Sequence, residues 1–190
     1  MDRRDALTKL TLLIGGAVSA PTFSAFISGC APPPSQGTYV PLSLDSNAFR
    51  LIGELSELII PETDTPGALT AGVDRYIDSV LTDIFSEDQR SDFFLGMEDF
   101  ASRAHATYGA DLTEISPEQQ RDFLVALEYE AFRGIPSHVL SAASFYRQVK
   151  ELTVTGYYTS EVGATMELHV MPYGKYRPIV PFEEIGRAWA

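Results

Sequence analysis

The chain has 190 residues, of which 45% are hydrophobic and 21% charged, and its formal net charge is −12. This apolar content is sufficient for a packed core and excludes a disordered chain. The acidity argues against nucleic-acid binding, which needs clustered lysine and arginine. The single cysteine, Cys30, excludes a disulfide framework, a cysteine-rich zinc or iron–sulfur site and covalent c-type haem.

Residues 1–30 have the layout of an export signal. A basic start with Arg3 and Arg4 leads into an apolar run over residues 10–20, and small residues follow up to Cys30. The run is too short and too rich in glycine to span a bilayer comfortably. The paired arginines resemble a twin-arginine export signal. A general secretory signal is the alternative, because paired arginines occur there as well.

The end of this leader predicts a lipid anchor and a tether. Residues 27–30, Ile-Ser-Gly-Cys, resemble a lipobox, which would make Cys30 a lipid acceptor rather than a buried or idle thiol. Residues 31–45 are rich in proline and are predicted to form an extended tether. The folded domain is therefore expected over residues 46–190.

Apolar residues recur at helical spacing from Ser46 onward and predict an all-α, orthogonal or bundle-like domain of five or six helices. The first helix must stop before Pro61, and the second has its apolar stripe over residues 73–84. Ser86 and Ser116 each precede a helix in a capping-box pattern. A fifth helix is expected from Ser137. No sustained alternation of period two predicts a strand.

The stripes of these helices define the expected core. The predicted inward residues are Ala48, Ile52, Leu55, Ile59, Val73, Ile77, Val80, Leu81, Ile84, Phe93, Met97, Phe100, Ala101, Ala104, Phe123, Leu124, Leu127, Ala131, Phe145, Val149 and Leu152. Residues 31–130 hold 5 basic and 19 acidic side chains, which fall mostly on the opposite faces. We interpret them as a solvated surface, with docking of a basic partner as the alternative.

The sequence shows no recognisable pattern of catalytic or metal-binding groups. The three histidines stand far apart, and neither Glu128 with Glu130 nor Glu183 with Glu184 forms the Glu-x-x-His pattern of di-iron sites. No glycine-rich phosphate loop follows a strand, and no Gly-x-Ser-x-Gly elbow is present. We therefore expect no catalytic, cofactor-binding or metal-binding residue on this chain.

The C-terminal tail is predicted to be irregular and aromatic. Tyr, Trp and Arg are the side chains enriched in interface hot spots. The candidate anchors for a partner protein are Tyr157, Tyr158, Tyr173, Tyr176 and Trp189, with Thr159, Ser160, Glu161 and Gly163 at the contact. The alternative is an internal strap that packs its aromatic rings on its own domain.

Three short segments carry a family resemblance. They are residues 59–68, Ile-Ile-Pro-Glu-Thr-Asp-Thr-Pro-Gly-Ala, with Gly72 and Val73; residues 152–165 around Gly-Tyr-Tyr-Thr-Ser-Glu-Val-Gly; and residues 186–189, Gly-Arg-Ala-Trp. Together with the leader they resemble subunit 3 of the gluconate 2-dehydrogenase family, the small subunit of bacterial membrane-bound flavin-dependent sugar dehydrogenases. The resemblance spans essentially the whole chain.

The resemblance implies a non-catalytic accessory subunit without a cofactor of its own. It implies a glucose–methanol–choline-type flavoprotein large subunit that holds FAD, and a multihaem cytochrome c subunit that holds haem. The small subunit would supply the export signal for the large subunit and stabilise it. The complex would then be periplasmic and held at the membrane by a partner or by a lipid anchor.

Two other hypotheses stay open from the residues alone. One is a free-standing periplasmic lipoprotein that serves as a binding or scaffold domain. The other is an enzyme that uses dispersed carboxylates, which the spacing of residues does not support.

Overall fold

The computed structural model describes residues 39–133, 141–168, 179–186 and 188. Val40–Ala190 form the folded unit that contains all described helices. Arg3, Arg4 and Cys30 of the expected leader lie outside the described residues. So do Tyr173, Tyr176 and Trp189 of the expected aromatic tail.

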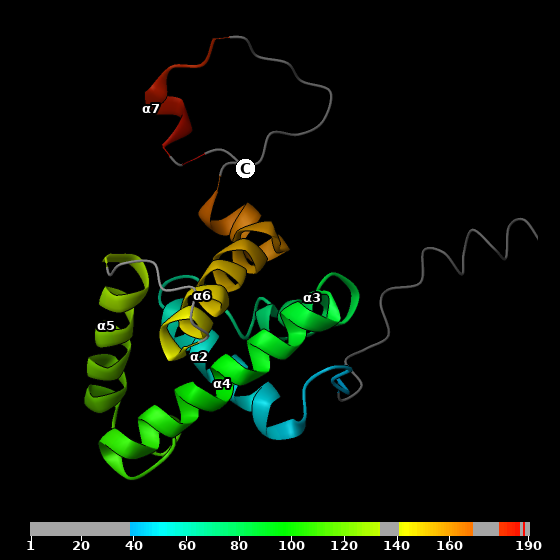
Figure 1. The fold of residues 1–190 in the computed structure, drawn as a ribbon. Helices are drawn as coiled ribbons and strands as arrows, with labels where there is room; N and C mark the ends of the chain where they lie inside the picture. Colours follow the sequence, from blue (N-terminus) through cyan, green and yellow to red (C-terminus); the bar gives the residue numbers. More distant parts are fainter. Residues whose placement is uncertain (1–38, 134–140, 169–178, 187, 189–190) are drawn as a thin grey trace, which may run out of the picture. The chain divides into compact units, whose positions relative to one another are not determined.

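The folded unit is helical, and the described residues contain no strand (Figure 1). The elements are α2 (Ser46–Ile59), α3 (Val73–Asp83), α4 (Glu87–Tyr108), α5 (Pro117–Arg133), α6 (Ala142–Thr159), the π-helix η1 (Gly163–Glu167) and α7 (Phe182–Ile185). The all-α prediction is confirmed.

Local sequence signals set most of the helix ends. The Ser86 side chain accepts from Gln89 N–H while the Gln89 side chain accepts from Ser86 N–H, which forms the predicted capping box of α4. Ser116 and Gln119 form the same pair before α5, at 3.0 and 3.3 Å. α4 ends at Tyr108, and Gly109 follows with a φ of 77°, the left-handed conformation that ends many helices.

The start of the fifth predicted helix differs from the sequence prediction. α6 begins at Ala142 rather than at Ser137, because Ser141 is extended, with a φ of −155° and a ψ of 163°. Ser141 and Ser144 form a capping box there, and the Ser141 side chain accepts from Ser144 N–H at 3.3 Å. A serine in place of the usual Glu or Gln at the third position hides this signal in the sequence.

The core is a chain of aromatic rings surrounded by aliphatic side chains. Phe93, Phe100 and Phe145 are fully buried, and Phe145 meets the other two rings edge-to-face with centroids 5.0 and 5.3 Å apart. Most predicted core residues are buried as expected. Ile84 is the clear exception: it is 71% exposed because α3 ends at Asp83, one residue before it.

Helix α6 occupies the centre of this arrangement and contacts α2, α3, α4, α5 and η1 (Figure 1). Gly96 of α4 allows a close approach of the two helices, since an added Cβ would stand 2.9 Å from the Cβ of Phe145. Helix α5 packs on α6 and buries Phe123, Leu124 and Leu127.

A buried carboxylate joins the segment before α2 to α3. Asp78 is fully buried, and its two oxygens accept three backbone N–H groups, from Leu42 at 2.8 Å and from Ser43 and Leu44 at 3.0 Å. The hydroxyls of Ser43 and Thr82 lie 2.7 Å apart beside this contact. A buried carboxylate needs such donors, and the three amide groups here fix residues 42–44 on α3.

We expect Asp78→Asn to lower the free energy of unfolding by about 1.5–3 kcal/mol, because the amide removes the charge and turns one acceptor into a donor. Urea unfolding of the purified chain measures this. Asp83→Asn, at the exposed end of the same helix, should change stability by less than about 0.5 kcal/mol. Equal stability of Asp78→Asn and the wild type would contradict the role assigned to this carboxylate.

Candidate functional site

The two main segments of the family resemblance meet in space. The Tyr157 hydroxyl donates to the carbonyl oxygen of Pro66 at 2.9 Å, across 91 residues of sequence. The Thr65 hydroxyl donates to a carboxylate oxygen of Glu167 at 2.6 Å. We call this region, residues 59–73 together with residues 156–167, the motif junction.

The loop of the motif junction is held by a carboxylate from α2. Glu57 accepts from the N–H groups of Glu62 and Leu69, each at 2.9 Å, so one side chain ties both ends of the loop. Ala68 N–H also donates to the Ile60 carbonyl at 3.0 Å. An added Cβ at Gly67 would overlap the Glu57 carboxylate, which explains why a glycine follows Pro66.

The other side of the junction is the end of α6 and the π-helix η1. Ser160 donates its hydroxyl to the Tyr157 carbonyl at 2.6 Å and accepts from Gly163 N–H at 3.1 Å. Leu168 N–H then donates to the Gly163 carbonyl at 3.1 Å, the wide spacing of a π-helix. Short π-helices are rare and occur frequently at functional sites.

The structure places one of the proposed anchors in the interior of the folded unit. Tyr157 is only 1% exposed and uses its hydroxyl within the chain, so it packs as an internal strap would and offers no free surface to a partner. Ser160 is half-buried and Gly163 is buried, and both shape the turn after α6.

Three of the expected contact residues lie on the surface of the junction. Tyr158 is 38% exposed, and its ring stands edge-to-face on that of Tyr157, with centroids 5.3 Å apart. Thr159 and Glu161 are exposed as well. The exposed side chain of Met166, on η1, adds an apolar residue that the sequence search did not select.

A second cluster of polar groups links α5 to α6. Lys150 donates to both oxygens of Glu128 at 2.7 Å. Burial acts to raise the pKa of Glu128, but hydrogen bonds from Lys150 and Tyr146 outweigh it and hold that pKa below its usual range. Burial and the bond to Glu128 raise the pKa of Tyr146 well above its usual range. Both groups therefore keep a fixed protonation state near neutral pH, which suits a structural link better than proton transfer.

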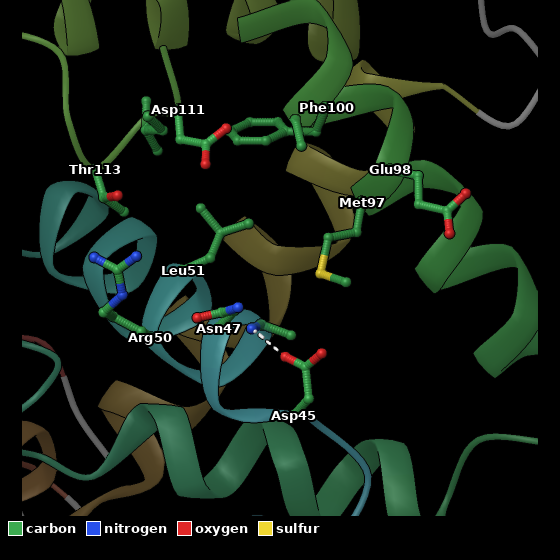
Figure 2. A pocket seen from close by; sticks show the side chains of 12 residues that line it. Asp45, Asn47, Arg50, Leu51, Met97, Glu98, Phe100, Asp111 and Thr113 are labelled. Atoms are coloured by element: carbon green, nitrogen blue, oxygen red, sulfur yellow. Dashed lines mark hydrogen bonds between the residues drawn. The ribbon is translucent and has the colours of Figure 1, made fainter. Parts of the chain in front are cut away.

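A shallow hollow of about 300 Å³ lies between α2 and α4 (Figure 2). Leu51, Met97 and Phe100 give it an apolar lining. Of its polar neighbours, Asp45 accepts from Ala48 N–H at 2.8 Å and Arg50 pairs with Glu54 at 3.6 Å, whereas the Thr113 hydroxyl is buried without a hydrogen-bond partner among the described residues. Nothing in this lining forms a set of groups aimed at one reacting atom.

The described residues contain no group of three or more His, Cys, Asp or Glu side chains placed to hold a metal ion. None of the described helices combines the length and the apolar character needed to cross a membrane.

The fold and the junction define a small all-α domain whose most elaborate feature is a packed contact between a loop and a helix end. Comparison with known families agrees with the resemblance found in the sequence. The model of the family described as gluconate 2-dehydrogenase subunit 3 matches residues 46–181, from the start of α2 through both junction segments. The chain belongs to this family, which is that of an accessory subunit of a dehydrogenase complex. No curated protein and no solved structure matches the chain.

We expect Gly156→Ala to disturb the junction, because the new Cβ would stand 2.5 Å from the ring of Tyr76 on α3. Overpacking of this kind costs about 1–3 kcal/mol, which exceeds the gain in helix propensity of about 1 kcal/mol or less. Thermal and urea unfolding measure the loss. Thr155→Ala, one residue earlier on an exposed position of α6, is the matched control. Unchanged stability of Gly156→Ala would show that Tyr76 moves away freely.

Proposed function

We propose that this chain is the non-catalytic small subunit of a periplasmic, membrane-associated, FAD-dependent dehydrogenase of sugars or sugar acids. It supplies the export signal for the flavoprotein large subunit and stabilises that subunit. The observation that carries this proposal is family membership over residues 46–181. The leader supports it, since Arg3 and Arg4 precede an apolar run as in a twin-arginine signal.

The separate roles of the two subunits follow from the chemistry of the flavoprotein. A flavoprotein folds around its FAD in the cytoplasm, and the twin-arginine route exports folded complexes. One leader on a small subunit therefore serves two chains. In this proposal FAD lies on the large subunit and haem on a cytochrome c subunit, while this chain holds neither. Lipidation of Cys30 would add a membrane anchor.

The proposed contact with the large subunit includes the exposed part of the motif junction. Tyr158 is the aromatic anchor there, and Thr159 and Glu161 surround it. The sequence alone supports three further contact residues in this proposal, Tyr173, Tyr176 and Trp189. Exposed aromatic side chains next to rigid backbone contribute strongly to binding, because little side-chain freedom is lost when they are covered.

Affinity purification of the tagged full chain from membranes tests the assembly. We expect a yellow, flavin-containing large subunit at near-equal stoichiometry, identified by its absorption spectrum and by mass spectrometry. A colourless chain recovered alone would contradict the proposal and favour the alternative of a free-standing lipoprotein, which the lipobox-like segment before Cys30 supports.

We expect the double variant Arg3→Lys, Arg4→Lys to block export of both this chain and its large subunit. Lysine keeps the charge but lacks the planar guanidinium group that the twin-arginine pathway reads. Dehydrogenase activity in the periplasmic fraction measures the block. As a control, a general secretory leader on the same body should export this chain without its partner. Normal periplasmic activity in the double-lysine variant would refute export by the twin-arginine route.

A further inference from the structure

Helix α5 carries apolar side chains on two faces. Its inner face holds the buried residues Phe123, Leu124 and Leu127. Its outer face presents Val125, Tyr129 and Phe132, which are 63%, 64% and 42% exposed. We call these three residues the outer row. Their spacing of four and three residues places them one above the other on the helix, so they form a continuous surface rather than scattered exposed residues.

Two carboxylates beside the outer row, Glu128 and Glu130, are paired with basic side chains of the chain. Arg103 donates to both oxygens of Glu130, at 2.7 and 2.5 Å, and Lys150 donates to both oxygens of Glu128. The guanidinium carbon of Arg147 and the ammonium of Lys150 each lie 5.2 Å from the centroid of the Phe132 ring. In a chain of net charge −12, this face therefore carries little net charge, which lowers the cost of removing it from water.

A groove of about 600 Å³ adjoins the outer row. Val125 belongs to both, and Leu124 and Arg121 of α5 line the same side. The opposite side includes Glu57, Leu58, Ile59 and Pro61, which lead into the loop of the motif junction. The outer row is thus continuous with the segment that carries the family resemblance.

We propose that the outer row and this groove form a docking surface for an apolar segment, neutral or basic at its edges, of the flavoprotein subunit that this chain accompanies. The proposal rests on the proposed function and locates a contact that the junction alone does not provide. The net charge of the chain distinguishes between the molecules that could cover this surface. Two copies of a chain with a net charge of −12 repel each other, and so do this chain and anionic lipid headgroups. A different protein with an apolar, non-acidic surface is not repelled in this way.

The test uses the full chain co-expressed with the flavoprotein subunit. Tyr129→Ser removes the most exposed side chain of the outer row, and Leu95→Ser is the matched control, a 49% exposed leucine in the middle of α4. We expect Tyr129→Ser to weaken the complex at least tenfold, as expected for truncation of an interface aromatic residue, and Leu95→Ser to leave affinity within about threefold. The melting temperature of each isolated chain should stay within about 2 °C of the wild type.

The possible outcomes separate the two proposals. Wild-type affinity of Tyr129→Ser would overturn the docking surface while leaving the proposed function intact, whereas a wild-type chain without a flavoprotein partner would refute the proposed function itself. A wild-type dimer or binding to anionic vesicles that Tyr129→Ser abolishes would overturn the choice of occupant. If Tyr129→Ser unfolds, Val125→Ser, which changes the row and the groove together, decides in its place.

Discussion

The packing of α6 against four other α-helices is the constraint on which the rest of the structure depends. Gly96 brings α4 against Phe145 near the start of α6, and Gly156 brings Tyr76 of α3 against its end. These two approaches fix the axis of α6, and thereby the place where the Tyr157 hydroxyl meets the Pro66 carbonyl. The Gly-Tyr-Tyr segment is therefore a packing motif first. Its buried tyrosine positions the loop, and its exposed tyrosine is the anchor that we propose for the large subunit.

Features that depend on neighbours in sequence could be predicted from it, and features that depend on distant partners could not. The capping box of Ser86 and Gln89 needs only residues three apart, so the start of α4 was predictable. The burial of Tyr157 could not be predicted, because its hydrogen-bond partner lies 91 residues away and aromatic residues are enriched in cores and interfaces alike. The burial of Asp78 could not be predicted either. An aspartate on a helix is expected to be solvent-exposed unless the three amide groups that it binds are known.

Charge and apolar surface are separated on this chain. Of its 26 acidic residues, 19 fall within residues 31–130, which keeps the body soluble through mutual repulsion. Two carboxylates at the outer row have basic partners, since Arg103 holds Glu130 and Lys150 holds Glu128. The hydrogen bond from Arg103 lowers the pKa of Glu130, so the pairing persists to moderately acidic pH and fades only as this carboxylate protonates. Neutral contact surface on an acidic body favours a foreign partner over self-association.

The Asp78 contact also limits the reach of the proposed anchor. Residues 42–44 are fixed on α3 by three backbone hydrogen bonds and Asp45 caps α2, so residues 42–45 belong to the folded unit rather than to the tether predicted over residues 31–45. Twelve residues span at most about 40 Å when fully extended. If Cys30 carries lipid as proposed, the chain between Cys30 and Leu42 keeps Leu42 within about that distance of the membrane surface. Without the Asp78 contact the tether would lengthen and the body would be held less closely. In the proposed assembly, this buried carboxylate would therefore limit the distance between the lipid anchor and the folded unit.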